Sequence, residues 1–159
     1  PVSLLKGHHM DHVWRTAPFD ALSTLELYAI MRLRMQVFVV EQQSIYLDLD
    51  NKDLQALHML CHAQGRLCAY QRCLPPGVSY DQSSLGRIVV HPAFRGAQLG
   101  RDLGERGIAC KREHWPDADI CISAQAHLQG FYSSLGFVAQ GDEYQEDGIA
   151  HRKMLLRFQ

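Results

Sequence analysis

The sequence has little that would place the protein in a membrane or on a polyanion. Its 159 residues contain no uninterrupted apolar stretch of the roughly 20 residues that a membrane-spanning helix needs. The formal net charge is −1, so there is no basic surplus to neutralise the phosphates of a nucleic acid. We therefore expect no nucleic-acid partner and no membrane partner, and we expect a small molecule as the first candidate ligand.

The sequence also gives little support to a disulfide framework or a metal centre. The five cysteines are odd in number and form no CxxC pair, and we recognise no secretory signal ahead of them, which favours reduced thiols in the cytoplasm. His58, Cys61 and His62 lie on one predicted strand, where side chains alternate between faces, so they are not expected to converge on one ion. The sequence predicts no metal.

The length and composition fit one globular domain. Hydrophobic residues make up 47% of the chain and charged residues 21%, which is ordinary for a protein with a single core. Residues 1–9 end in Gly7-His8-His9, directly ahead of Met10, and read as an expression tag or vector-derived segment. We therefore expect residues 10–159 to form one domain.

Alternating helix and strand patterns predict the fold class. Ser23 and Glu26 form a capping box that begins a helix reaching about Phe38. The face expected to be buried holds Leu25, Ala29, Leu33 and Val37. Later helices are expected from the 95–100 loop to about 113 and over 128–135, and strands over 57–63, 67–74, 85–90, 119–124, 137–143 and 151–158. This order implies an α/β (α+β) fold, with a mixed central sheet of about six to seven strands and helices on both faces.

An acidic segment follows the first predicted helix, with Asp48, Asp50 and Asp53. A solvated loop is the simplest interpretation, and an alternative is that its field attracts a cationic amine. A calcium-binding EF-hand is disfavoured, because Asp53 and Met59 stand where that loop needs glycine and glutamate. Arg87, inside the apolar strand 85–90, needs a partner and is expected to pair with an acidic residue.

The segment from Leu85 to Arg101 carries the strongest functional signal. A buried strand runs through His91-Pro92 into a glycine-containing loop that opens a helix, and the first N–H groups of a helix have no partners within it. Such an end favours anions, and the glycines allow a ligand to approach the backbone closely. Arg95 and Arg101 add positive charge, so we expect a diphosphate to bind here.

The helix after this loop contains Gly100, Gly104 and Gly107. Each glycine costs about 1 kcal/mol relative to alanine in a helix interior, so we expect something to approach this helix closely. Tight turns and helix packing alone are the alternative explanation. A dinucleotide-binding fold is disfavoured, because the GxGxxG spacing is absent and the loop follows several strands.

Together with several other segments, this loop resembles the GNAT N-acetyltransferases and, within them, the ElaA-like family. The resemblance covers roughly residues 22–157 and depends on Val37–Gln42, Tyr46–Asp50, Ala124–Gln129, Phe131–Phe137 and Tyr144–His151. The acetyl-CoA loop of the family reads Q/R-x-x-G-x-G/A. Arg95, Leu99 and Gly100 match this pattern, whereas Gln98 stands in place of the middle glycine.

The resemblance implies acetyl-CoA as the cosubstrate and indicates which residues bind it. The backbone of Ile88, Val89 and Val90 would pair with the pantetheine arm, and Gln125 would hydrogen-bond the same arm. The loop residues that would hold the diphosphate are Arg95, Gly96, Ala97, Gln98, Leu99, Gly100 and Arg101.

Tyr132 is the residue expected to act in catalysis and to lie against the cofactor. A phenol within reach of the leaving sulfur can protonate it, and many members of the family place a tyrosine at this helix position. The alternative is a core aromatic residue. The amine must lose a proton before it attacks, and the candidate bases are Glu41, His127, His151 or a chain of waters.

The expected activity is transfer of an acetyl group from acetyl-CoA to a primary amine by direct attack in a ternary complex. The sequence does not distinguish a small-molecule acceptor from a peptide or a lysine side chain. The alternative function is a non-catalytic sensor or regulatory module that binds acyl-CoA. The terminal strands are a candidate edge for a homodimer.

Overall fold

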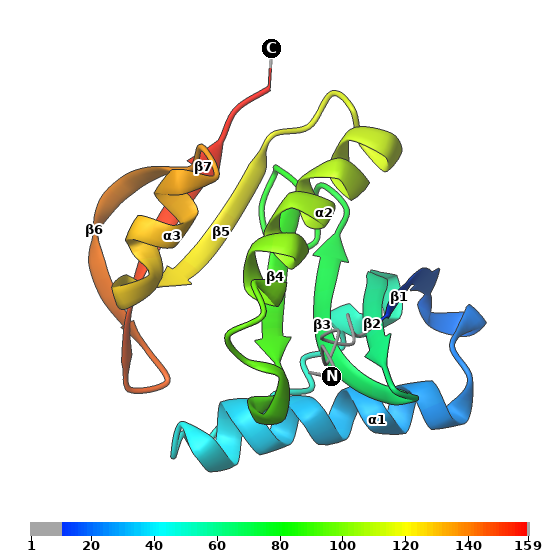
Figure 1. Ribbon diagram of the computed structural model, residues 1–159. Helices are drawn as coiled ribbons and strands as arrows, with labels where there is room; N and C mark the ends of the chain where they lie inside the picture. Colours follow the sequence, from blue (N-terminus) through cyan, green and yellow to red (C-terminus); the bar gives the residue numbers. More distant parts are fainter. Residues whose placement is uncertain (1–10, 159) are drawn as a thin grey trace, which may run out of the picture.

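Seven strands and three α-helices form the part of the chain that the computed structural model describes, residues 11–158 (Figure 1). The strands are β1 (His12–Pro18), β2 (Leu57–Ala63), β3 (Arg66–Leu74), β4 (Ser84–Val90), β5 (Ile120–Gln125), β6 (Val138–Glu146) and β7 (Ile149–Leu156). The α-helices are α1 (Thr24–Arg34), α2 (Leu99–His114) and α3 (Gln129–Ser134). The segment interpreted as a tag lies outside the described residues.

The strands form two antiparallel sheets that meet at one point. One sheet has the order β1-β2-β3-β4, and the other has the order β5-β7-β6. Among residues 11–158 the sheets are joined by the parallel bridge between Ser83 and Ile120, where the Ser83 amide donates to the Asp119 carbonyl at 3.0 Å. Beyond this bridge β4 and β5 diverge, as Figure 1 shows. The predicted fold class is confirmed, and the sheet is split between its two central strands.

Helices cover both faces of the four-stranded sheet, as predicted. Neighbouring strand residues point to opposite faces, and Leu60 and Cys61 of β2 belong to separate core clusters. α1 packs with Ile30 and Leu33 on the face of Leu60, whereas α2 packs with Leu103 on the face of Cys61. Burial on both sides explains why β3 is buried along almost its whole length.

Helix α1 begins at the predicted capping box. The Ser23 hydroxyl accepts from the Glu26 amide at 3.0 Å, and the Glu26 carboxylate accepts from the Ser23 amide at 2.9 Å. The predicted buried face is wrong in the first turn, because Leu25 is 83% exposed and burial begins only at Ile30, where the helix reaches the sheet. From Met35 to Glu41 the helix continues as a π-helix, an irregularity that is frequent at functional sites.

Strand β1 has no counterpart among the predicted elements. It pairs antiparallel with β2, from His12 opposite Ala63 to Pro18 opposite Leu57, and forms an edge of the sheet. An edge strand meets solvent on part of its surface, and Val13 is 62% exposed. The apolar alternation that marks a strand is therefore weak in this segment.

The acidic segment is buried, which corrects the expectation of a solvated loop. Asp48 and Asp53 are 2% and 6% exposed, and both contact Arg34, which has no exposed surface. Arg34 Nε lies 2.7 Å from Asp48 Oδ2, and Arg34 Nη1 lies 2.7 Å from Asp53 Oδ1. A guanidinium on the buried face of a helix needs such partners, and this pairing draws the acidic segment onto α1.

All five cysteines are buried, and none forms a disulfide. Within the described range 11–158, no cluster of three or more His, Cys, Asp or Glu side chains is placed to hold a metal ion. None of the helices in that range has both the length and the apolar composition needed to cross a bilayer.

Candidate active site

A cleft of about 540 Å³ opens where β4 and β5 diverge, and we call it the central cleft. Its walls come from β4, β5, β7, the π-helix and the loop after it. Its volume is within the range of about 300–1,000 Å³ that is typical of small-molecule sites. The predicted site residues that line it are Ile88, Val89, Val90, Arg95, Gln125, Tyr132 and His151.

The edge of β4 that faces β5 is open. β4 pairs with β3 along its other edge, and beyond Ser83 no described residue forms a strand pair with the edge toward β5. Unpaired backbone groups favour a ligand that brings amides of its own. The stretch predicted to bind the pantetheine arm, Ile88 to Val90, lines the central cleft along this strand.

A bulge in β4 brings Arg87 to the acidic segment. Arg87 has a φ of +52°, which is uncommon for a residue with a side chain, and the pairing of β4 with β3 shifts register here. The Arg87 Nε lies 2.8 Å from Asp48 Oδ1, which confirms the predicted acidic partner. Asp50 links Arg87 to Arg72, because its Oδ2 lies 3.4 Å from Arg87 Nη2 and its Oδ1 lies 2.7 Å from Arg72 Nη1.

The resulting ion network is balanced in charge. Its members are Arg34, Arg72, Arg87, Asp48, Asp50 and Asp53. Burial would by itself raise the pKa of Asp50, but the hydrogen bonds and positive charge of Arg72 outweigh it and lower that pKa to about 2. Since three guanidinium groups neutralise three carboxylates, the acidic segment has no net negative field with which to attract an amine.

The loop before α2 presents a row of unpaired amides. The amides of residues 96–101 donate to no backbone carbonyl among the described residues, as expected at a helix N-terminus. A shallow hollow of about 380 Å³ lies beside them, with Gly96 and Gly100 in its lining. Gln98 has a φ of +59°, so at the position where the family pattern has glycine it adopts the left-handed conformation that glycine tolerates best.

Both arginines near the loop are paired within the protein. Arg95 Nη1 and Nη2 contact the Glu41 carboxylate at 2.6 and 3.1 Å, and Arg101 Nε lies 3.1 Å from Glu105 Oε1. The positive charge expected around a diphosphate is therefore partly compensated. The hydrogen bond from Arg95 lowers the pKa of Glu41, which weakens this carboxylate as a base, and Glu41 does not line the central cleft.

The three glycines of α2 have different surroundings. A Cβ added at Gly104 would lie 2.6 Å from Leu135 Cδ1, and a Cβ at Gly107 would lie 2.8 Å from Leu85 Cδ1. A Cβ at Gly100 would meet nothing within 4 Å. The close approach predicted for this helix comes from the protein's own core at two positions, whereas Gly100 leaves open space beside the loop.

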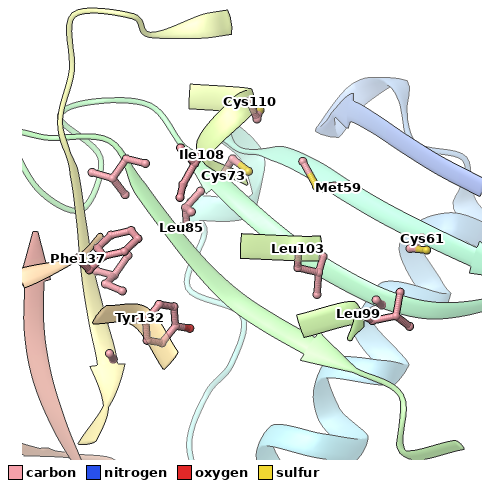
Figure 2. Close-up of a cluster of buried hydrophobic side chains, with 14 of the residues drawn as sticks. Met59, Cys61, Cys73, Leu85, Leu99, Leu103, Ile108, Cys110, Tyr132 and Phe137 are labelled. Atoms are coloured by element: carbon pink, nitrogen blue, oxygen red, sulfur yellow. The ribbon is translucent and has the colours of Figure 1, made fainter. Parts of the chain in front are cut away.

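Tyr132 lies between the two diverging strands with its ring fixed by aromatic neighbours. It is 8% exposed, and its ring meets Phe131 and Phe137 edge-on, at centroid distances of 5.1 and 5.9 Å. Figure 2 shows the ring between β5 and β4, with its hydroxyl directed toward β4. Burial raises the pKa of Tyr132 to about 12, so the phenol is protonated at neutral pH.

Of the two histidines predicted as bases, His151 reaches the central cleft. His127 is exposed and lies outside the cleft lining, whereas His151 is 8% exposed and belongs to it. The Nδ1 of His151 lies 2.7 Å from the Ile149 carbonyl, which makes Nδ1 the donor. Nε2 lies 3.2 Å from Glu146 Oε2, so a proton carried by Nε2 would be donated to this carboxylate.

Three polar residues around His151 are absent from the predicted site. The Ser123 hydroxyl contacts the Tyr144 hydroxyl and lies 3.3 Å from Glu146 Oε2, and the Tyr144 ring stacks on His151. Cross-strand pairing places Tyr144 and Gln125 opposite His151. The alternation of polar residues along the terminal strands is a usable signal, but only the divergence of β4 and β5 shows which face meets the cleft.

The loop after the π-helix links the two walls of the central cleft. Gln125 Nε2 donates to Gln42 Oε1 at 3.3 Å, and the Ser44 hydroxyl donates to the Asp147 carbonyl at 2.9 Å. Gln125, predicted to bind a ligand, therefore has a replaceable partner. The Ser44 contact narrows the opening between α1 and the β6–β7 turn, which favours a small ligand on this side.

Comparison with known proteins identifies the family. Residues 31–158 match the family model described as an acetyltransferase (GNAT) domain. Protein ElaA of Escherichia coli is 39% identical over 140 residues, which cover 87% of this chain and 92% of ElaA. A UPF0039 protein of Synechocystis is 37% identical over 149 residues, which cover 93% of this chain and 97% of that protein.

Solved structures agree with the sequence matches. The crystal structure of an acyl-CoA N-acyltransferase from Pseudomonas aeruginosa has a TM-score of 0.89 at 39% identity, and the match covers 92% of this chain and 100% of that chain. The crystal structure of Escherichia coli ElaA has a TM-score of 0.87 at 37% identity, with the same coverage. The chain is therefore an acyltransferase of the GNAT family and belongs to its ElaA-like branch.

Proposed function

We propose that this acyltransferase moves the acetyl group of acetyl-CoA to a primary amine by direct attack in a ternary complex. The observation that carries the proposal is Tyr132, a protonated phenol that lines the central cleft between β4 and β5 and has no hydrogen-bond partner among residues 11–158. The Pseudomonas relative is described as an acyl-CoA N-acyltransferase, which supports an acyl-CoA donor.

The residues of the site fit acetyl-CoA, which supplies the acetyl group as an activated thioester. The open edge of β4 at Ile88 to Val90 would pair with the pantetheine amides, and the unpaired amides of residues 96–101 would hold the diphosphate. Gly100 leaves room there, because no atom lies within 4 Å of an added Cβ. Gln125 would exchange its contact with Gln42 for one with the arm.

Two side chains would move protons in this scheme. His151 Nε2 would take the proton of the acceptor amine, directly or through a water, because Nδ1 is engaged by the Ile149 carbonyl. Tyr132 would donate its proton to the leaving sulfur. Glu41 and His127 have no part in the scheme, since Glu41 is bound to Arg95 and His127 lies outside the central cleft.

Release of free thiol separates acetyl transfer from the alternative of an acyl-CoA sensor. The protein is mixed with acetyl-CoA and a panel of primary amines, and free thiol and N-acetylated product are measured in the same samples. We expect amine-dependent thiol release matched by an equal amount of acetylated amine. Binding of acetyl-CoA without product from any amine would contradict the proposal and favour the sensor.

Alanine at Gly100 and alanine at Gly107 are expected to have opposite effects. Gly100→Ala fills open space on a helix and should stabilise the fold by up to about 1 kcal/mol. It should also weaken coenzyme A binding about tenfold, the cost of roughly one hydrogen bond to a charged group. Gly107→Ala crowds Leu85 and should destabilise the fold by about 1–3 kcal/mol. Thermal unfolding and calorimetric titration measure both effects, and unchanged coenzyme A affinity in Gly100→Ala would contradict the diphosphate site.

A further inference from the structure

Most charged groups that line the central cleft are neutralised by partners of opposite sign. Asp50 contacts Arg72 and Arg87, and Arg95 contacts Glu41. Lys52 also lines the cleft and is half-buried. Within residues 11–158 Lys52 forms no salt bridge, and its Nζ donates instead to the Ser79 hydroxyl at 2.9 Å.

A second lysine lies near the residue that follows Ser79. Lys153 Nζ is 5.2 Å from the centroid of the Tyr80 ring, and Tyr80 lines the central cleft next to Ser79. Lys153 is two residues from His151 on β7, so both side chains belong to the same face of the sheet. Its ammonium likewise forms no salt bridge within the described part of the chain. Lys52, Ser79 and Tyr80 line the cleft, and the exposed Lys153 approaches Tyr80 from outside that lining. We call these four residues the cationic end of the cleft.

The opposite charge gathers around His151. Glu146 lies 3.2 Å from His151 Nε2, and both Glu146 and Asp147 line the central cleft. An amine arrives as an ammonium ion, which the carboxylates attract to the residue that would take its proton. The two lysines then repel a second cationic group and favour an anionic one. Carboxylates near His151 and unpaired lysines near Ser79 and Tyr80 therefore both border the cleft.

We propose that the acceptor is a small amine that also carries an anionic group, a carboxylate or a phosphate, which Lys52 and Lys153 bind. This inference depends on the acetyl transfer proposed above and names the class of its acceptor. The cleft volume of about 540 Å³ and the contact between Ser44 and Asp147 favour a compact molecule. Tyr80 lines the cleft and supplies an aromatic surface near Lys153 for the carbon chain of the acceptor.

Matched amines test the proposal. 6-Aminohexanoate is compared with hexylamine, which has the same chain and a similarly basic amine but no anionic group, and phosphoethanolamine is compared with ethanolamine. We expect kcat/KM for the anionic member of one pair to be about tenfold higher or more, as for a hydrogen bond to a charged group. A preference within the first pair identifies a carboxylate as the bound group, and a preference within the second pair identifies a phosphate. Equal rates within both pairs, or faster reaction of the members without an anionic group, would overturn the inference.

Substitutions locate the origin of the preference. The double variant Lys52→Met and Lys153→Met should lose the preference, because kcat/KM for the anionic member falls to that of its partner without an anionic group. Arg157→Met removes an exposed cation that does not line the central cleft and should leave the preference intact. Lys52→Arg with Lys153→Arg should restore most of it. A preference that survives in the double methionine variant would overturn the assignment.

Failure of the proposed function would look different from failure of this inference. Acetylation of hexylamine without any preference would refute the anionic acceptor and leave acetyl transfer standing. If no amine is acetylated, calorimetric titration of the coenzyme A-saturated protein with the same amines decides the matter. Tighter binding of an anionic member that is lost in the double methionine variant would support the cationic end as a binding site, and equal binding or none would overturn it.

Discussion

Tyr132→Phe is expected to lower kcat by about 100- to 10,000-fold, the usual contribution of a positioned proton donor, while leaving the affinity for coenzyme A almost unchanged. Phenylalanine fills the same space between Phe131 and Phe137. Because the hydroxyl has no hydrogen-bond partner within residues 11–158, its removal breaks no contact of the described fold. The variant therefore loses a proton donor and little else. Steady-state turnover and calorimetric titration with coenzyme A measure the two quantities.

Tyr28→Phe is the matched control, because Tyr28 is 71% exposed on α1 and does not line the central cleft. It should turn over at the wild-type rate. In the wild type, burial holds the Tyr132 pKa at about 12, so loss of its proton should not reduce kcat below about pH 10. Wild-type turnover by Tyr132→Phe on a competent amine would remove the acid role. A parallel loss of coenzyme A affinity would point instead to a packing role.

The second large effect is expected on stability. Arg34→Met should lower the free energy of unfolding by about 3–5 kcal/mol, the cost of breaking a buried ion pair from one side. Arg34 has no exposed surface, and its removal leaves Asp48 and Asp53 buried with one cation fewer. Urea unfolding at neutral pH measures the loss. Activity should fall as well, because Asp48 also holds Arg87 at the bulge of β4.

Arg15→Met provides the contrast, because it breaks the exposed ion pair between Arg15 and Glu26, which has an N–O distance of 2.8 Å. Such pairs contribute about 1 kcal/mol or less. The pKa values of Asp50 and Asp53 are lowered in the folded state, that of Asp50 to about 2, so the stabilisation by these two carboxylates is complete above their ordinary value of 3.8 and is lost in more acidic solution. The difference between wild type and Arg34→Met should therefore shrink in acid. Equal losses in the two methionine variants at neutral pH would contradict a structural role for the network.

The parts of the structure that could be predicted are those with local signals. Ser23 and Glu26 are three residues apart, and their capping box fixes where α1 begins. The strand, loop and helix from Leu85 to Arg101 also form one continuous segment, so its anion-binding character can be predicted before the fold is known. A heptapeptide such as Phe131–Phe137 carries enough of a family pattern to place Tyr132 on a helix after β5.

The parts that were missed or wrong depend on contacts between distant segments. In the sequence Asp48 looks like part of a solvated loop, because its partner Arg34 lies 14 positions away on α1. In the sequence Glu41 looks like a free carboxylate, because its partner Arg95 lies 54 positions away, in the loop before α2. The glycines of α2 look alike in the sequence, and only packing separates Gly100, which faces open space, from Gly107, which faces Leu85. No local pattern contains this information.

Hydrogen exchange at the amides of residues 96–101, measured with and without coenzyme A, tests most directly whether the donor binds where β4 leads into α2. These amides lack backbone acceptors within the described structure and should exchange rapidly in the free protein. Saturating coenzyme A is expected to slow them strongly and to slow the amides of residues 88–90 to a smaller extent. Coenzyme A that binds, as calorimetry would report, yet leaves residues 96–101 exchanging at the rate of the free protein would contradict the site.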